Sequence, residues 1–213
     1  MKNTLFHGEM AIDDLDFSKL LQLVLKCNHD SGSVVICKDK TKFDFKEARR
    51  KLNRCLKRNY YYLSREWPYK NVKPKIVCEK YLLDNENLEL NDYRFLCCDG
   101  NPKFIMVDFN TTDKTKKRRN LYDLEWNLLG AEISYPRELG IKCPKPNNLE
   151  KMINLSKRLS KGIPHVRVDL YSIKDKIYFG EMTFYHQSGT AKINPKEFEI
   201  EMGNWIELSK TKK

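Results

Sequence analysis

The chain has 213 residues, and its 40 Lys and Arg against 29 Asp and Glu give a formal net charge of +11. This length suits one globular unit or two small lobes and excludes a string of domains. With 40% hydrophobic residues the chain can build a core, so global disorder is excluded. No apolar run reaches the roughly 18 residues that span a bilayer, and acidic residues Glu9, Asp13 and Asp14 stand where a signal peptide needs an apolar stretch. We expect a soluble, cytoplasmic protein.

The basic excess favours anionic partners, but charge alone does not choose among nucleic acid, nucleotide phosphates and acidic sugars. The seven cysteines are an odd number, with no C-x-x-C pair and no His at zinc spacing. We expect them to be reduced core residues. They are Cys27, Cys37, Cys55, Cys78, Cys97, Cys98 and Cys143.

The first part of the chain predicts a strand, a loop, a strand, a helix and a strand. Apolar runs at 20–25 and 34–37 flank the polar turn formers of 26–33. Residues 45–58 place their apolar side chains at helical spacing, which is typical of an amphipathic helix lying on a sheet. After an aromatic connector, residues 75–82 resume a strand pattern.

Two hairpins are predicted further along. Residues 93–98 and 103–108 flank Asp99-Gly100-Asn101-Pro102, a strong turn signal. The second hairpin joins 166–172 to 176–185 through a turn at 174–176.

The segments between the two hairpins are more varied. We expect the basic run 111–120 to be a loop and 121–136 to be irregular strand and turn. A helix follows Asn147 or Asn148, either of which can cap it, and stops at Gly162.

The loop after Lys26 is the first candidate site. A strand that ends in Lys and passes into a Ser/Gly loop can present backbone N–H groups and a point charge to phosphate oxygens. Gly32 supplies the positive φ that such a loop needs. A plain hairpin with one glycine is the structural alternative.

The end of the strand at 77–82 is the second candidate site. Glu79 beside exposed backbone groups can read an adenine edge, and Tyr81 with Leu82 can sandwich the ring. Asp92 follows a short link and can accept from ribose hydroxyls. The alternative is a strand end with solvated charges.

The last hairpin is the third candidate site. Strand alternation turns Val166, Val168 and Leu170 to one face and Arg167 with Asp169 to the other. A turn near Asp175 brings Asp169 and Glu181 together, and Mg²⁺ prefers a few carboxylate oxygens completed by substrate phosphate. An adjacent Arg would complement a transferring phosphoryl group. The alternative is a solvated face on which the two carboxylates pair with lysines.

The basic run that contains Arg118 and Arg119 is usually a solvated loop, and its functional interpretation is a mobile flap that touches phosphate or an acidic acceptor. No His has ligand spacing, so no catalytic imidazole is assigned.

In order along the chain, these segments resemble the ATP-grasp superfamily. LVLKCNHDSGSVVICKDK looks like its strand, Lys and phosphate loop, KIVCEKYL like its adenine hinge, and HVRVDLY with IYFGEMTFYHQSG like its metal-binding strands. More closely, KCNHDSG, RKLNRCLKRNYYYLSREWPYKNVKP, EKYL, NDYRF, RRNLYDLEWNLL and VRVDLY with YFGEMTFY resemble the TupA-like ATP-grasp family of bacterial surface-polysaccharide and teichuronopeptide biosynthesis, often labelled glycosyltransferase. The resemblance runs from about Asp13 onward.

This resemblance implies an α+β ATP-grasp fold in which two α/β lobes with antiparallel sheets grip MgATP. Residues 20–82 would be the nucleotide-binding lobe and 83–213 the metal- and substrate-binding lobe. Residues 1–19 would be the remnant of an amino-terminal lobe that is mostly missing.

The resemblance also implies roles for individual residues. Asp169 and Glu181 would hold Mg²⁺, with Thr183 where superfamily members commonly have Asn, and Asp92 would hold ribose. Lys26 and Arg167 would be catalytic, with Arg167 near the γ-phosphate. ATP phosphates would contact Lys26, His29, Asp30, Ser31, Gly32 and Ser33. Adenine would contact Glu79, Lys80, Tyr81 and Leu82, and the substrate would contact Arg118 and Arg119.

The implied activity is MgATP-dependent ligation of a carboxylate to an amine through an acylphosphate. The carboxylate acceptor would be a small molecule or a glycan, with no nucleic acid and no membrane span. One alternative is a glycosyltransferase, although its usual D-x-D motif is absent, and another is a truncated nucleotide-binding remnant without ligase activity. A nucleic-acid-binding module driven by the +11 charge predicts affinity that falls steeply with salt.

Overall fold

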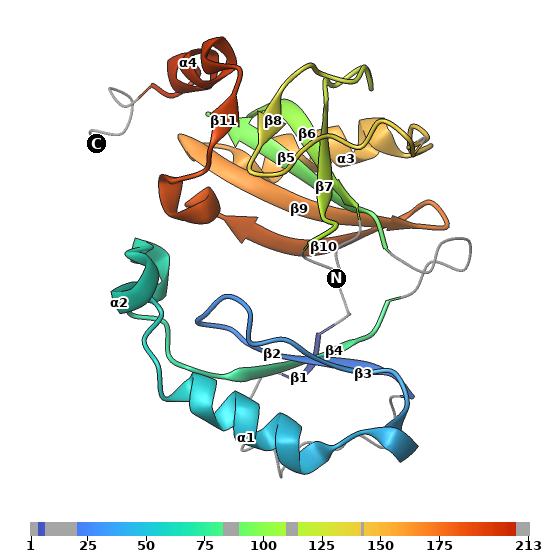
Figure 1. Cartoon of the computed structure of the whole chain (residues 1–213), viewed down its shortest axis with the longest axis vertical. Helices are drawn as coiled ribbons and strands as arrows, with labels where there is room; N and C mark the ends of the chain where they lie inside the picture. The colour runs from blue at the N-terminus through green and yellow to red at the C-terminus, as the bar shows by residue number, and fades with distance from the viewer. Residues whose placement is uncertain (1–3, 7–20, 83–89, 110–114, 142, 208–213) are drawn as a thin grey trace. The chain divides into compact units, whose positions relative to one another are not determined.

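The computed structural model describes residues 4–6, 21–82, 90–109, 115–141 and 143–207. The chain divides into two compact units, Met1–Leu82 and Leu83–Lys213 (Figure 1). Each unit combines helices with antiparallel strands, so the α+β class is confirmed. No helix in the described ranges is long and apolar enough to cross a membrane.

The first unit contains a four-stranded antiparallel sheet with the order β1-β4-β2-β3. The predicted strands are present as β2, β3 and β4, and β1 adds an edge strand that the sequence did not predict. Most of the proposed remnant at 1–19 lies outside the described residues. The strands are β1 (Thr4–Phe6), β2 (Leu23–Cys27), β3 (Val35–Cys37) and β4 (Ile76–Lys80).

Helix α1 (Phe45–Leu56) covers one face of this sheet, as the amphipathic pattern predicted. The Asp44 carboxylate caps the helix by accepting from the Glu47 backbone N–H at 2.9 Å. Leu52 of α1 packs with Leu23 and Leu25, so strand alternation turns Lys26 to the opposite face. The remaining short helices are η2 (Lys40–Lys42), α2 (Tyr61–Ser64) and η3 (Trp67–Tyr69).

The second unit is built on a five-stranded antiparallel sheet with the order β10-β9-β5-β6-β7. Both predicted hairpins are present, as β5 with β6 and as β9 with β10. Their turns each have two residues with positive φ, Asp99 and Gly100 in the first and Lys174 and Asp175 in the second. The strands are β5 (Asp92–Cys98), β6 (Asn101–Phe109), β7 (Arg118–Tyr122), β9 (His165–Ile173) and β10 (Lys176–Thr183).

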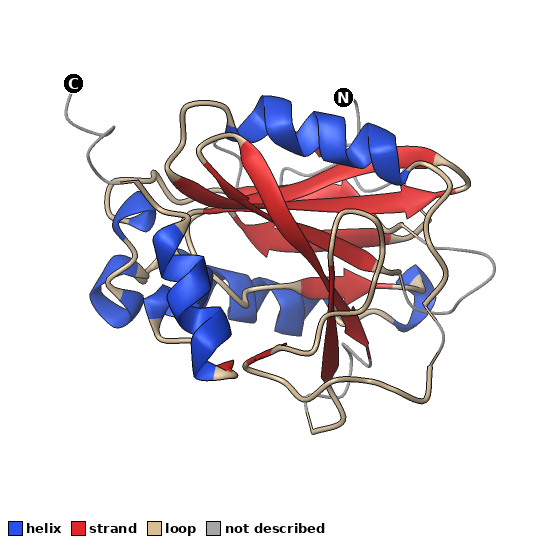
Figure 2. Cartoon of the chain, turned by 90° about the horizontal axis from the view of Figure 1, so that it is seen from above, coloured by secondary structure: helices blue, strands red, loops and turns tan. Residues whose placement is uncertain are grey.

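One face of the five-stranded sheet is apolar and is covered by helix α3 (Leu149–Ser160), which lies along it (Figure 2). Phe95, Val107 and Val168 point into this core. Asn148 precedes the helix, but its side chain does not cap it and instead accepts a hydrogen bond from the Ser172 hydroxyl at 3.1 Å.

The opposite face of the sheet has an apolar part and a charged part. Leu96, Phe104 and Met106 form the apolar part with partly buried residues of α4 (Lys196–Asn204). The sequence predicted no helix or strand beyond residue 185. The other elements there are β8 (Glu132–Ile133), paired with β11 (Ile193–Asn194), and η4 (His186–Gly189).

Two sequence predictions need correction. The first turn closes at Asp99-Gly100, because β6 already begins at Asn101. Arg118 and Arg119 are not in a solvated loop but in strand β7, and Arg119 is only 1% exposed. The apolar residues that follow, Leu121 and Tyr122, draw this strand into the sheet.

All seven cysteines are free, as predicted, and six are buried. Cys27, Cys37, Cys55 and Cys78 belong to the core between α1 and the first sheet. Burial raises the pKa of Cys27 and Cys97 to about 11, so these thiols stay protonated.

Candidate functional site

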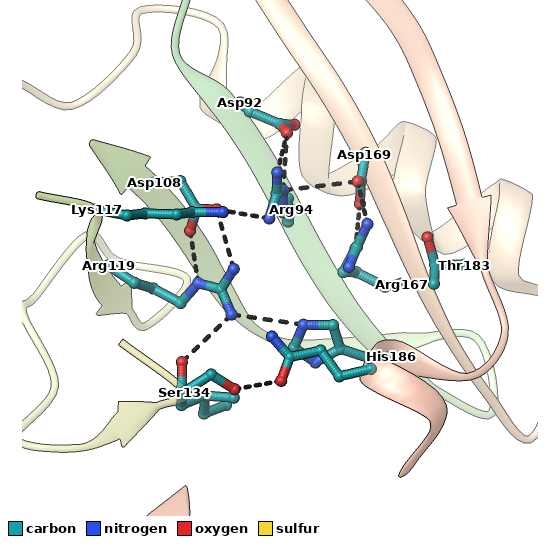
Figure 3. Close-up of polar contacts among 12 residues, drawn as sticks. Asp92, Arg94, Asp108, Lys117, Arg119, Ser134, Arg167, Asp169, Thr183 and His186 are labelled. Atoms are coloured by element: carbon teal, nitrogen blue, oxygen red, sulfur yellow. Dashed lines mark hydrogen bonds and ion pairs between the residues drawn. The ribbon is translucent and has the colours of Figure 1, made fainter. Parts of the chain in front are cut away.

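Four cations and four carboxylates form a network on the charged part of the second sheet, and Figure 3 labels all of them except Glu181. Every member points to this face because alternate residues of β5, β6, β7, β9 and β10 do so. We call this group the charged network. Its members are Asp92, Arg94, Asp108, Lys117, Arg119, Arg167, Asp169 and Glu181.

Asp108 lies at one centre of the network and is 3% exposed. Arg119 binds it through two nitrogens, with Nε 2.5 Å from Oδ1 and Nη2 2.9 Å from Oδ2. Arg94 Nη1 and Lys117 Nζ also reach Oδ2, at 2.7 and 2.8 Å. Burial alone would raise the pKa of Asp108, but the three cations hold it well below its usual range. The carboxylate is therefore ionised at neutral pH.

Arg167 lies at the other centre, between Asp169 and Glu181. Its Nε and Nη2 donate to the two Asp169 oxygens at 2.7 and 2.6 Å, and Nη2 also donates to Glu181 Oε1 at 2.7 Å. Asp169 and Glu181 are directly paired across β9 and β10. The predicted convergence of the two carboxylates on one face is therefore present, and a guanidinium holds them together.

A β-bulge gives this pairing its register. The register shifts between Phe179 and Glu181, so Gly180 is left without a partner. A Cβ at Gly180 would lie 3.1 Å from the Asp169 carbonyl oxygen and 3.0 Å from Cε2 of Tyr171. Both contacts are tighter than an ordinary Cβ contact, so glycine favours this close approach, in which Glu181 lies opposite Asp169.

Asp92 and Arg94 connect the two centres. Arg94 contacts Asp92 at 2.6 Å and Asp108 at 2.7 Å, and its Nε lies 3.7 Å from Asp169 Oδ2. Burial would lower the pKa of Arg94, but the carboxylates around it raise that pKa well above its usual value. Oδ1 of Asp92 is buried and has no hydrogen-bond partner in the part of the chain that the structure describes.

His186 borders the network beside Arg119, with 3.4 Å between His186 Nε2 and Arg119 Nη1. Burial and the neighbouring arginines lower the pKa of His186 to about 3. The imidazole is therefore neutral at physiological pH and can accept from the Arg119 guanidinium.

In the first unit, Lys26 pairs with Glu79, with 2.9 Å between Nζ and Oε2. The two side chains are about one third exposed, at 33% and 32%. They lie on adjacent strands β2 and β4, on the face that α1 leaves free. Lys26 was predicted to contact the ATP phosphates and Glu79 the adenine, and the two residues instead form an ion pair with each other in this structure.

The loop that follows Lys26 is held by its own side chains. The Ser33 hydroxyl accepts from the Cys27 N–H at 3.0 Å and donates to the Asp30 carboxylate. His29 is 1% exposed, and its Nε2 lies 3.3 Å from the Cys55 carbonyl oxygen and 3.1 Å from that of Arg58. The imidazole thus anchors the loop to α1 instead of facing solvent. Gly32 has φ +92°, as the loop prediction required.

The hinge after β4 is short. Strand β4 ends at Lys80, and the Tyr81 N–H donates to the Gln22 carbonyl at 3.3 Å. Lys38 Nζ lies 5.7 Å from the centre of the Tyr81 ring. Tyr81 and Leu82 are half-buried.

A model of the TupA-like ATP-grasp family matches residues 6–207. The chain belongs to this family. The resemblance stated from the motifs is thereby confirmed over almost the whole sequence. No curated protein matches the chain.

Several solved ATP-grasp ligases are similar to this TupA-like chain. A D-alanine–D-alanine ligase from Bacillus anthracis is 16% identical, with a TM-score of 0.47 over 92% of this chain and 57% of that one. The same ligase complexed with ATP is 18% identical, with a TM-score of 0.43 over 85% and 46%. The ATP-grasp ligase PsnB, complexed with a minimal precursor, is 10% identical, with a TM-score of 0.42 over 78% and 41%. The chain thus spans about half the length of these proteins.

The residues of the last hairpin fit a Mg²⁺ ion. Within the described ranges, no group of three or more His, Cys, Asp and Glu side chains is arranged to hold a metal. Mg²⁺ in nucleotide enzymes, however, needs only one or two carboxylates, with substrate phosphates and waters completing the octahedron. One Asp169 oxygen and one Glu181 oxygen already share a positively charged nitrogen, and the Thr183 hydroxyl lies 2.8 Å from Glu181 Oε1.

Sequence reasoning missed Arg94 and Asp108 as members of the site and did not assign Lys117 or His186 to it. The signal for Arg94 was available, since Asp92 and Arg94 alternate with apolar Tyr93 and Phe95. No local signal marks His186, which reaches Arg119 from a segment 67 residues away.

Proposed function

We propose that the chain is a MgATP-dependent carboxylate–amine ligase that works through an acylphosphate. The observation that carries this proposal is the Asp169, Arg167 and Glu181 cluster in a TupA-like ATP-grasp chain. Two carboxylates aimed at one point provide a divalent-cation site, and the arginine beside them provides a donor for phosphate oxygens.

Asp169 and Glu181 would hold Mg²⁺, and the Thr183 hydroxyl is a weaker third oxygen. The ion would supply charge neutralisation and orientation of the ATP phosphates. With Mg²⁺ bound by Asp169 and Glu181, the Arg167 guanidinium would be available to donate to the γ-phosphoryl oxygens. Phosphoryl transfer needs mainly positioning and charge stabilisation, which is what such a group provides.

The first unit would contribute the remaining ATP contacts. Lys26 would donate to phosphate oxygens, and its exposed, charge-balanced pair with Glu79 can open at little cost. The backbone of the loop at 30–33 would add N–H donors around the phosphates. Residues 79–82 would hold adenine. Asp92, which belongs to the second unit, would accept from ribose.

A carboxylate acceptor would need cations near the reacting γ-phosphoryl group. Arg119 is buried and its guanidinium already contacts Asp108, the Ile133 carbonyl and His186, so it would act by positioning Asp108 and Lys117. Arg118 is half-buried and donates to the Lys117 carbonyl at 3.0 Å. Of the two, Arg118 is the better placed to meet a substrate directly.

Calorimetric titration of the full chain with ATP, with and without Mg²⁺, tests the proposal. Asp169→Asn and Glu181→Gln should each abolish the Mg²⁺ dependence of ATP binding. The double variant should lose little more than either single one, because the two residues act as a unit. Asp175→Asn is the matched control, since it removes an exposed carboxylate from the turn of the same hairpin.

The reaction itself can be tested with hydroxylamine, which traps an acylphosphate as a hydroxamate. ATP-dependent hydroxamate formation with a carboxylate acceptor, lost in Arg167→Gln, would support the ligase. Tighter binding of a sugar nucleotide than of ATP would contradict it in favour of glycosyl transfer. Binding of an oligonucleotide with a steep salt dependence, and none of ATP, would contradict it in favour of a nucleic-acid-binding module.

A further inference from the structure

The first unit contains a pocket of about 250 Å³ whose cationic lining residues are not among the predicted ATP contacts. One wall is the loop at 30–33, another is the carboxyl-terminal half of α1, and a third is the start of α2. Three cationic side chains line it: Lys51, Arg54 and Arg58.

The walls of the pocket are fixed by hydrogen bonds within the unit. The His29 imidazole ties the loop to the carbonyl groups of Cys55 and Arg58, and the Ser33 hydroxyl ties the loop to its own strand. The Tyr60 ring packs edge to face on Tyr69, with 5.0 Å between ring centres. The pocket is therefore built before any ligand arrives.

The cations of the pocket lack the partners that the charged network has. Lys51 Nζ donates to the Val34 carbonyl at 2.8 Å, which leaves two of its donors free. Arg54 and Arg58 are exposed, and neither guanidinium has an ion pair or hydrogen bond within the described residues. Asp30 is the one carboxylate of the lining, and it accepts from Ser33.

The spacing of the three cations concentrates their charge. Lys51 and Arg54 are three residues apart on α1, so their side chains project from one side of the helix, and Arg58 lines the same pocket just after the helix ends. Like charges at such spacing repel, and an anion between them removes the repulsion. Two arginines also provide paired N–H donors in the geometry that phosphate and carboxylate groups accept.

We infer that this pocket is a second oxyanion-binding site, which holds a phosphate or carboxylate group of a compact ligand. Its cations are separate from Lys26 and Glu79, because these two residues lie on the sheet face opposite α1. The two sites share only the loop at 30–33, which forms one wall of the pocket and presents its backbone to the predicted phosphates.

The pocket can be tested by titrating the full chain with inorganic phosphate, acetate and glucose 6-phosphate. Glucose is the uncharged comparison, and amide chemical shifts report the binding. Phosphate or acetate should shift residues of the loop and of α1, and glucose should not. Whichever of phosphate and acetate binds more tightly identifies the preferred oxyanion. Arg54→Gln and Arg58→Gln should each weaken that binding about tenfold or more, since each removes charge-assisted hydrogen bonds.

Arg50→Gln is the matched control, because Arg50 belongs to the same helix, lies outside the pocket and pairs with Glu47. It should leave oxyanion binding unchanged, and neither pocket variant should change ATP affinity more than twofold. Equal oxyanion affinity in Arg50→Gln, Arg54→Gln and Arg58→Gln would overturn the inference. Displacement of phosphate from the pocket by MgATP would also overturn it, since the pocket would then belong to the ATP site.

Discussion

The two units arrange their charged residues in opposite ways. In the second unit, buried arginines and aspartates satisfy one another, and Asp108 alone accepts from three cations. In the first unit, the cations of the α1 pocket are exposed and Lys26 has a single, partly exposed partner. Asp108 and the arginines around it are paired in the folded chain, whereas the cations of the α1 pocket have hydrogen-bond donors without partners among the described residues.

The buried charges of the second unit stabilise the fold, whereas the exposed cations of the first unit are available to bind a ligand. A buried ion pair costs much desolvation, so removing one partner leaves the others uncompensated. An exposed pair contributes about 0 to 1 kcal/mol and can be broken easily when a ligand offers a better contact. Substitutions of Asp108 and its partners should therefore act on stability, and those of the exposed cations of the first unit on binding.

Asp108→Asn should give the largest effect. The substitution leaves Arg119, Arg94 and Lys117 around a neutral side chain in a buried site, which we expect to lower the free energy of unfolding by about 3 to 5 kcal/mol. Urea denaturation measures the change. Glu181→Gln is the control, because its side chain is 59% exposed and should cost at most about 1 kcal/mol. Equal losses in the two variants would abolish the distinction between buried and exposed carboxylates.

Acid should destabilise the protein by protonating Asp108. Because the pKa of Asp108 is held well below its usual value, its stabilising contribution is fully present above about pH 3.9, the ordinary Asp value, and is lost as pH falls through its depressed native pKa. Stability curves between pH 6 and pH 2 should therefore fall more steeply for the wild type than for Asp108→Asn. Parallel curves would show that another group dominates acid unfolding.

Lys26→Ala should lower ATP affinity by roughly tenfold to a hundredfold, which corresponds to about 1.5 to 3 kcal/mol for a charge-assisted contact. Its effect on stability should be below about 1 kcal/mol, since the pair with Glu79 is partly exposed. Calorimetry and urea denaturation of the same preparation separate the two quantities. Unchanged ATP affinity in a folded variant would remove Lys26 from the proposed site.

The sequence predicted those parts of the fold that local periodicity controls. Alternation in residues 166–170 was enough to orient Arg167 and Asp169, and two turns fixed both hairpins. It failed for Arg118 and Arg119, because a run of charges looks like a loop unless its buried partner is known. That partner, Asp108, lies on the neighbouring strand and is visible only once β6 and β7 are paired.

The candidate site, like the fold, was predictable only where local periodicity or a turn controls the structure. Asp169 and Glu181 could be brought together by counting from a turn, although the bulge at Gly180 that completes their pairing left no pattern in the sequence. The pocket of the first unit depends on where His29 attaches the loop to α1, 26 residues along the chain. Contacts over such a separation have no local signature.

Gly180→Ala should misalign Asp169 and Glu181, the pair that we propose binds Mg²⁺. The new Cβ would meet the Asp169 carbonyl oxygen, a backbone atom that cannot move aside alone, so β10 must shift. We expect a loss of about 1 to 3 kcal/mol in stability, as for other overpacked sites, and a weaker effect of Mg²⁺ on ATP binding. Gly203→Ala is the control, since a Cβ there meets nothing within 4 Å and alanine favours the helix. Full Mg²⁺ dependence in Gly180→Ala would show that the bulge does not set the site.

The smallest expected effect is a preference for ATP over GTP in the first unit. Glu79 already pairs with Lys26, so the acceptors left for a base are the backbone carbonyls of the hinge at 80–82. A carbonyl acceptor can accept a hydrogen bond from the exocyclic amine of adenine, but it repels the carbonyl oxygen that guanine has at that position. One such hydrogen bond is worth about 0.5 to 1.5 kcal/mol, which corresponds to about a twofold to tenfold preference.

Lys26→Ala should lower the affinity for both nucleotides and leave the ratio of the two affinities unchanged, because ATP and GTP have the same phosphates. Equal affinities of the wild type for ATP and GTP would show that the hinge does not hold the base, and a ratio altered by Lys26→Ala would show that the ion pair with Glu79 takes part in base selection.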